Sequence, residues 1–152
     1  MLRLTKKTEY ALLALRSLAR ATDELVTTKA IAQRYQIPEM LLAKVLQKLK
    51  KQGIVAATKG SGGGYRLARD LGALPLIDVL GLFDEHKTLV ECQDEDGGQC
   101  QQSAHCDIKG PLEVLNAAVM EPLRRMTVRD LFIAPPRPGQ SPFTSLITER
   151  LV

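Results

Sequence analysis

Apolar residues recur with helical spacing through most of the chain and suggest strands in only one short region. Ala11, Leu15 and Leu18 fall on one helical face, which predicts an amphipathic helix over about residues 6–21. A short polar break follows. Thr27 or Thr28 can then cap a second, shorter helix that runs through Gln33.

A third helix shows the most regular apolar stripe, which consists of Leu42, Val45, Leu46 and Leu49. Pro38 suits its first helical position, and Gly53 suits its end. Immediately afterwards, IVAAT and YRLA bracket KGSGGG and predict a β-hairpin. The order helix, helix, turn, helix, hairpin is typical of a winged helix-turn-helix.

The C-terminal half returns to helical spacing after a polar segment. Residues 76–83 predict a short helix, and from Pro111 a longer stripe is formed by Leu112, Leu115, Val119, Leu123 and Met126. A second copy of the chain could cover this stripe, with Asn116 fixing the register; alternatively, the helix packs on its own domain. Pro122 is expected to kink or interrupt the helix, and Thr127 to cap a last short helix, VRDLF.

These elements predict a mainly α fold with a small β-hairpin, a winged helix-turn-helix plus a long dimerisation helix. We expect a DNA-binding domain over residues 1–84 and a cysteine-rich segment over 85–110. The dimerisation helix and a short closing helix would occupy 111–132, and a proline-rich flexible tail 133–152.

Charge separates the two halves of the chain. Residues 1–70 hold fourteen Lys/Arg and five Asp/Glu, a net of +9, whereas residues 71–152 hold seven and twelve, a net of −5. A basic first half indicates a polyanionic partner, although it could also be a solvated surface. Together with the winged pattern, it predicts binding to a double-stranded DNA operator.

Candidate DNA-binding residues lie on the second helix, the third helix and the wing. The third helix has an apolar back for docking and a polar front that could enter a major groove, while wing glycines let the backbone approach phosphates. The candidates are Thr28, Lys29, Glu39, Met40, Lys44, Lys48, Lys59, Ser61, Gly62, Gly63 and Gly64.

All three cysteines, Cys92, Cys100 and Cys106, lie within fifteen residues of the polar segment, spaced C-x7-C-x5-C. Paired knuckles typical of structural zinc are absent from this spacing. Long gaps suit a loop that wraps an iron–sulfur cluster, for which thiolates are good ligands. Zinc, a thiol sensor and structurally incidental cysteines remain alternatives.

Several function classes are disfavoured by composition. No apolar run reaches the ~18 residues needed to cross a bilayer, so no membrane association is expected. The N-terminus lacks the pattern of a secretory leader, and an odd cysteine count argues against a disulfide framework, so a cytoplasmic location is expected. Without a nucleophile–base grouping or a phosphate-binding loop, the chain is not expected to be an enzyme.

The chain resembles the Rrf-type family of bacterial transcription regulators. This family includes the iron–sulfur cluster assembly regulator, the nitric-oxide-sensitive repressor and the rhizobial iron regulator. The resemblance rests on RLTKKTEYALLAL, LLAKVLQKLKKQGIV, KGSGGGYRLAR, the three cysteines and MTVRDL, which together span about residues 2–132. It implies a homodimeric winged-helix regulator, expected to be a repressor, that holds its cluster between the cysteine segment of one subunit and the first helix of the other.

A cluster with three cysteine ligands needs a fourth. One family pattern has a histidine three residues after the last cysteine, where this chain has Lys109; another has an acid early in the first helix, which Glu9 of the partner subunit matches. Glu9 could instead simply complement the helix dipole, and His105 is a weaker alternative ligand. A [4Fe-4S] cluster is favoured and [2Fe-2S] is the alternative; a cluster-free thiol- or zinc-dependent winged-helix regulator is the competing hypothesis.

Overall fold

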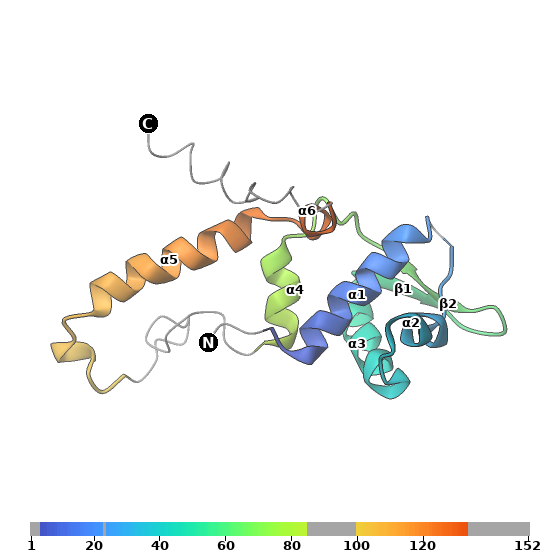
Figure 1. Cartoon of the computed structure of the whole chain (residues 1–152), viewed down its shortest axis with the longest axis horizontal. Coiled ribbons are helices and arrows are strands. Elements are labelled where there is room, and N and C mark those ends of the chain that lie inside the picture. Colours follow the sequence, from blue (N-terminus) through green and yellow to red (C-terminus); the bar gives the residue numbers. More distant parts are fainter. Residues whose placement is uncertain (1–3, 23, 85–99, 134–152) are drawn as a thin grey trace.

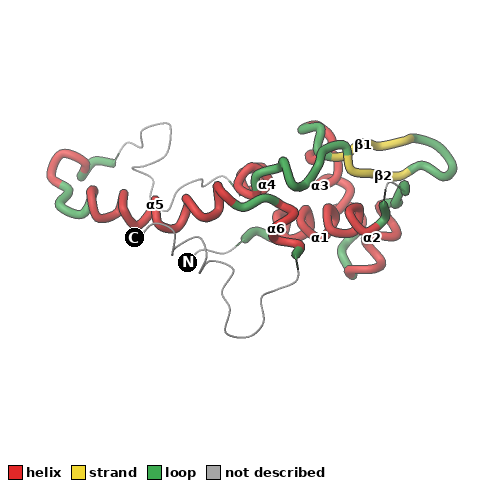
Figure 2. The backbone as a smooth tube through the Cα atoms, turned by 90° about the horizontal axis from the view of Figure 1, so that it is seen from above, coloured by secondary structure: helices red, strands yellow, loops and turns green. Residues whose placement is uncertain are grey.

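A computed structural model describes residues 4–22, 24–84 and 100–133 of the chain (Figure 1). Most of the predicted cysteine-rich segment, including Cys92, therefore lies outside the described residues, as does the predicted tail apart from Ile133. The described part is mostly helical with a single two-stranded antiparallel sheet, as Figure 2 shows. The predicted fold class is confirmed.

Helix α1, Lys6–Arg20, forms the centre of the winged domain. Thr5 caps it, because the Thr5 hydroxyl oxygen accepts a hydrogen bond from the Thr8 backbone amide at 3.2 Å. Ala11 and Leu15 are fully buried on its inner face. The small alanine side chain allows neighbouring helices to approach closely, and α1 packs against both α3 and α4.

Helices α2, Thr28–Tyr35, and α3, Glu39–Lys51, form the helix-turn-helix. Thr27 caps α2 by accepting from the Ala30 amide at 3.1 Å, which decides between the two predicted caps. α3 begins one residue later than expected. Pro38 has an extended ψ of 119° and lies before the helix, where its carbonyl accepts from the next turn. A proline fits there because it has no amide to leave unpaired.

Gly53 follows α3 with a positive φ of 66°, as expected of a glycine that ends a helix. Strands β1, Val55–Thr58, and β2, Gly64–Leu67, then pair in register from Val55 opposite Leu67 to Thr58 opposite Gly64. Val26 pairs with Tyr65 on the other edge of β2 through two backbone hydrogen bonds of 2.9 Å. The segment before α2 therefore anchors the base of the wing.

Helices α4, Leu76–Phe83, and α6, Val128–Phe132, lie beside each other although they are far apart in sequence. The Leu76 amide donates to the Met126 carbonyl at 2.8 Å, and the Val128 amide donates to the Leu74 carbonyl at 3.0 Å. Val128 is fully buried in the same hydrophobic core as α1 and α3. The predicted short closing helix thus completes the core of the winged domain.

Helix α5, Lys109–Arg125, starts two residues earlier than predicted and continues through Pro122, so the predicted interruption does not occur. Pro111 is tolerated because the first-turn amides of a helix have no intrahelical acceptor. Pro122 removes only one hydrogen bond near the end of the helix. The last turn keeps an ion pair between Arg125 and Glu121 at 2.9 Å.

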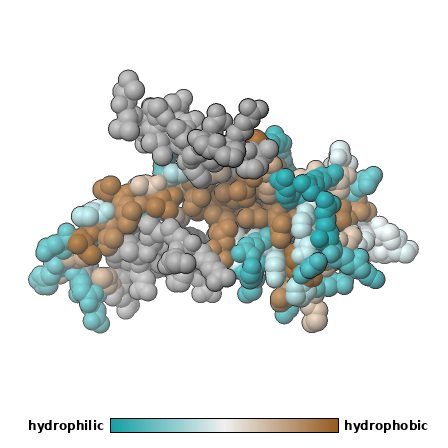
Figure 3. Space-filling view, in the orientation of Figure 1, coloured by the Kyte–Doolittle hydropathy of each residue, from teal (hydrophilic) through white to brown (hydrophobic). Residues whose placement is uncertain are grey.

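α5 projects away from the winged domain (Figure 1), and several of its apolar side chains are exposed. Val114 is 72% exposed and Leu115 is 51% exposed, whereas Met120 is the buried residue on this helix. Figure 3 shows this hydrophobic surface along α5. Contiguous apolar surface of this kind is typical of an interaction site. Among the described residues, no helix has the length and apolar character needed to span a membrane.

The capping box of α6, formed by Thr127 and Asp130, makes the stability of the folded chain depend on pH. The backbone hydrogen bond from Thr127, followed by that from the Thr127 hydroxyl, lowers the pKa of Asp130 below its ordinary value. The two bonds measure 2.8 and 2.7 Å. Because the folded-state pKa is the lower one, the stabilisation is fully present above the unfolded-state pKa. It is lost as pH falls through the folded-state pKa.

We therefore predict that Asp130→Asn lowers the free energy of unfolding by about 0.3–1 kcal/mol near neutral pH, the range for an acid in a helix first turn. The difference from the wild type should disappear in acid. Urea unfolding at about pH 7 and about pH 2.5 tests both statements. A stability difference that stays constant across this range would contradict the assigned role of the carboxylate.

Candidate nucleic-acid interface and cysteine segment

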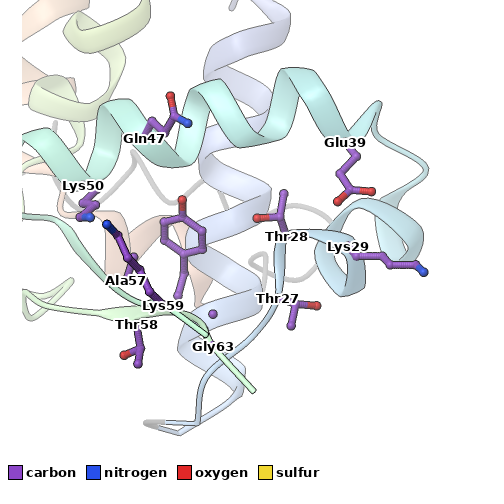
Figure 4. Close-up of a pocket in the computed structure, with 12 residues that line it drawn as sticks. Thr27, Thr28, Lys29, Glu39, Gln47, Lys50, Ala57, Thr58, Lys59 and Gly63 are labelled. Atoms are coloured by element: carbon purple, nitrogen blue, oxygen red, sulfur yellow. The ribbon is translucent and has the colours of Figure 1, made fainter. Parts of the chain in front are cut away.

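A groove of about 460 Å³ opens between the start of α2, one side of α3 and the wing (Figure 4). These three elements meet because the α2–α3 turn and the Val26–Tyr65 pairing fix the helices and the wing in one body. The groove brings together six residues predicted from the sequence: Thr28, Lys29, Glu39, Lys59, Gly63 and Gly64.

Five other predicted residues do not line this groove. Met40 and Lys44 are exposed on the adjacent side of α3, and Met40 is 78% exposed. Ser61 and Gly62 are exposed at the tip of the wing. Lys48 faces another way, with its amino group 5.4 Å from the centre of the Phe83 ring.

The groove also includes residues outside the list of candidates predicted from the sequence. Gln47 and Lys50 follow Glu39 at eight and eleven residues, so all three lie on one side of α3. This spacing was visible in the sequence. Which side of α3 faces the wing was not, because that depends on where the hairpin packs. Thr27, Ala57, Thr58 and Tyr65 complete the lining.

The groove carries more positive than negative charge. Lys29, Lys50 and Lys59 line it together with one acid, Glu39. In Figure 4, Lys50 and Lys59 lie at one end, whereas Lys29 and Glu39 lie near the other. A basic groove beside an exposed helix suits a polyanion whose backbone passes over the lysines.

The wing depends on glycines for its shape. Gly60 and Gly62 have positive φ values of 108° and 86°, and the Gly63 amide closes the turn by donating to the Gly60 carbonyl at 2.9 Å. A Cβ on Gly63 would lie 2.4 Å from the Thr58 carbonyl oxygen. The backbone here leaves no room for a side chain.

Two of the three cysteines are described, on the segment that precedes α5. Cys100 and Cys106 are both free thiols and partly exposed, and the Cys100 thiol donates to the Gln102 side-chain oxygen at 3.4 Å. His105 is exposed at the end of a 3-10 helix, Ser103–His105. Free thiols held on an open loop are suited to soft metal centres such as iron–sulfur clusters.

Glu9 lies in the first turn of α1, where it forms an ion pair of 2.6 Å with Lys6. Its side chain is 37% exposed, and ion pairs this exposed are weak. Figure 1 and Figure 2 place the start of α1 far from the segment that precedes α5 in the same chain. Within the described ranges, no three Cys, His, Asp or Glu side chains gather into a metal-binding group.

Comparison with known protein families places the chain in one of them. The Rrf2 family, described as an iron-dependent transcriptional regulator, matches residues 4–133. The chain belongs to the Rrf2 family. It is 34% identical to the HTH-type transcriptional regulator NsrR of Bacillus subtilis over 131 residues, which cover 86% of this chain and 90% of NsrR. It is also 32% identical to protein aau3 of Rhizobium meliloti over 90% of this chain and 88% of that protein.

Solved structures agree with this assignment. CymR of B. subtilis, described as the global cysteine regulator, has 26% sequence identity and a TM-score of 0.66, covering 86% of this chain and 96% of CymR. A transcriptional regulator from Listeria innocua reaches a TM-score of 0.69 at 27% identity, over 86% and 85% of the two chains. This Rrf2 protein is therefore a DNA-binding transcription regulator and not an enzyme, which confirms those two sequence predictions.

The wing geometry of this Rrf2 protein is directly testable. We predict that Gly63→Ala distorts the turn and lowers the free energy of unfolding by roughly 1–3 kcal/mol, because the added methyl overlaps the Thr58 carbonyl. Amide NMR shifts of residues 58–64 should move. Ser61→Ala, at an exposed position of the same turn, is the control and should leave these shifts nearly unchanged. Unmoved wing resonances in Gly63→Ala would contradict the geometry.

Proposed function

We propose that this Rrf2 protein is a homodimeric repressor that binds a double-stranded operator with an affinity set by an iron–sulfur cluster. One observation carries the proposal. The family of iron-dependent regulators matches residues 4–133, which include Cys92, Cys100 and Cys106. The two described thiols are unpaired and partly exposed, as metal ligands on a loop should be. Relatives named NsrR and IscR support the assignment.

The groove and the exposed side of α3 form the proposed operator-binding surface. α3 would enter the major groove, where Met40 can contact a thymine methyl and Glu39 can accept from cytosine. Lys29, Lys50 and Lys59 would meet phosphates at the edge. Gly62 and Gly63 would bring the backbone of the wing close to the sugar–phosphate chain.

A second copy of the chain is the proposed occupant of the apolar side of α5. Val114 and Leu115 are exposed there, and pairing of two α5 helices would remove both from water. The two copies of α3, the reading helices, would then lie at a fixed separation and contact two half-sites of the operator.

Cys92, Cys100 and Cys106 would hold the cluster, with Glu9 of the partner subunit as the fourth ligand. Glu9 suits this role because only an exposed pair with Lys6 has to be given up. His105, exposed beside Cys106, is the weaker alternative. Three thiolates and one oxygen ligand favour [4Fe-4S] over [2Fe-2S]. When bound, the cluster supplies an oxidisable iron–sulfide centre that responds to iron supply, nitric oxide or redox state.

The chain's own residues would convert that response into a change of operator affinity. A bond from Glu9 to the partner's cysteine segment would connect the start of α1 with the other subunit. α1 packs directly on α3, so freeing its start would alter the separation of the two reading helices. A coupling of about 1–3 kcal/mol corresponds to a change in affinity of roughly 5–150-fold.

A cluster-free regulator that uses thiols or zinc is the second candidate. It is favoured by the similarity to CymR, a global cysteine regulator, at a TM-score of 0.66. In this case the same operator surface would respond to oxidation or metal binding at Cys100 and Cys106.

We predict that Lys59→Met weakens operator binding and reduces the slope of log K against log salt by about 0.9, the value for one phosphate contact. Arg124→Gln removes an equal charge from an exposed position on α5 and should leave the slope unchanged. Fluorescence anisotropy with labelled operator between about 50 and 200 mM salt measures both. Equal slopes in the wild type and Lys59→Met would exclude this lysine from the interface.

We further predict that Cys106→Ala, purified without oxygen, loses iron and sulfide. Its operator affinity should shift by roughly 5–150-fold toward that of the apo-protein. Gln101→Ala, at an exposed position on the same segment, should keep both cluster and affinity.

Iron, sulfide and zinc assays with visible absorption separate the two candidates. A colourless wild-type preparation that contains zinc, or no metal, supports the cluster-free regulator. Wild-type protein without iron and sulfide that still binds the operator at full affinity would overturn the cluster proposal.

A further inference from the structure

The last two residues before the undescribed part of the cysteine segment each contact a different helix. Phe83 ends α4, and its ring lies 5.4 Å from the Lys48 amino group on α3. Asp84 follows, and its Oδ2 accepts a hydrogen bond of 3.0 Å from the Thr8 hydroxyl on α1. α4 lies close to both helices (Figure 1 and Figure 2). Residues 83 and 84 therefore join the reading helix, the first helix and the start of the cysteine segment.

The contact between Asp84 and α1 is a hydrogen bond to a buried hydroxyl. Thr8 is fully buried, although it lies in the first turn of an otherwise open helix end. Its hydroxyl donates to Asp84, so the 2.8 Å contact between the Thr8 and Thr5 hydroxyls must have Thr5 as the donor. A buried hydroxyl bound to a carboxylate is costly to separate, because its proton would lose a charged acceptor.

The contact with α3 involves a lysine that the groove does not use. At ~100° per residue, Lys48 lies about a quarter turn from Gln47, on the side of α3 opposite to Lys50. Gln47 and Lys50 line the groove, whereas Lys48 reaches the Phe83 ring. A lysine held over an aromatic ring forms a cation–π contact and is directed away from the groove.

We propose that Phe83 and Asp84 form a junction through which the cysteine segment acts on the reading helix, with Lys48 and Thr8 as positioning residues of that junction. The inference rests on the proposed function, because it supplies the route from the cysteines to the operator. It changes the role of Lys48 from a candidate DNA-binding residue to a regulatory contact. Thr8 lies next to Glu9, so one turn of α1 carries both the junction and the proposed fourth ligand.

The test compares two lysines of the same helix. Lys48→Met keeps the aliphatic stem and removes the charge, and Lys50→Met is the matched control in the groove. For each protein, operator affinity is measured with and without cluster, and the salt slope is measured on the apo-protein. Lys50→Met should reduce the slope by about 0.9 and leave the ratio of the two affinities unchanged. Lys48→Met should keep the slope and lower the ratio about two- to fivefold, the change that corresponds to an exposed cation–π contact.

The hydroxyl of Thr8 is tested in the same way. Thr8→Val has nearly the same shape without the hydrogen bond and should lower the ratio of the operator affinities measured with and without cluster. Thr8→Ser keeps the hydroxyl and should keep the ratio of the wild type. Thermal unfolding midpoints identify variants that are merely destabilised. If Thr8→Val folds poorly, the test still rests on Thr8→Ser, a conservative substitution, and on Lys48→Met, a substitution at an exposed position.

Three other results would contradict either the junction or the proposed function. A slope reduced by about 0.9 in Lys48→Met would make Lys48 a phosphate contact and overturn the junction. An unchanged ratio in both Lys48→Met and Thr8→Val, with a wild type that does respond to the cluster, would overturn the junction alone. A wild-type protein whose operator affinity is the same with and without cluster would refute both the proposed function and the junction.

Discussion

The close approach of α1 to α3 and α4 is the constraint on which the rest of the structure depends. Ala11, Ala14 and Leu15 of α1 are completely buried, and the two alanines allow close contact between the helix backbones. Close-packed protein interiors transmit displacement instead of absorbing it. The same helix holds Thr8 and Glu9 in its first turn. A single rigid element thus supports the reading helix at one side and carries the proposed regulatory contacts at its start.

The sequence predicted the winged domain well because its elements follow local rules. The stripe on α3 repeats with helical period, Thr27 and Thr127 are good caps, and Gly53 takes the positive φ that ends a helix. The errors concern prolines. Pro122 stays within α5 because it costs only one hydrogen bond near the end of the helix, and such a small cost cannot be judged from the residue type alone.

The candidate sites were less predictable, because they depend on contacts between distant residues. Helical spacing separates Lys48 from Lys50 on α3, but only the positions of α4 and the wing show which of the two lysines faces the groove. Thr8 is a buried polar residue in the first turn of α1, and the acceptor of its hydroxyl, Asp84, lies 76 residues away in the sequence. The cysteine spacing suggested a soft metal centre, yet the start of α1, which carries Glu9, lies far from the segment that precedes α5 within one chain. The proposed site would unite them across two subunits, and no local pattern encodes such an arrangement.

The anchoring of the wing has a consequence for operator choice. Val26 fixes the base of β2 by two backbone hydrogen bonds, whereas the tip turns on Gly60 and Gly62. In the proposed complex, the glycine backbone of the tip would contact phosphates without reading base edges. The helix in the major groove would then discriminate bases strictly, while the flanking base pairs would be selected through DNA shape and deformability. Operators of this protein should accordingly share a narrow set of central contacts and vary most where the hairpin lies.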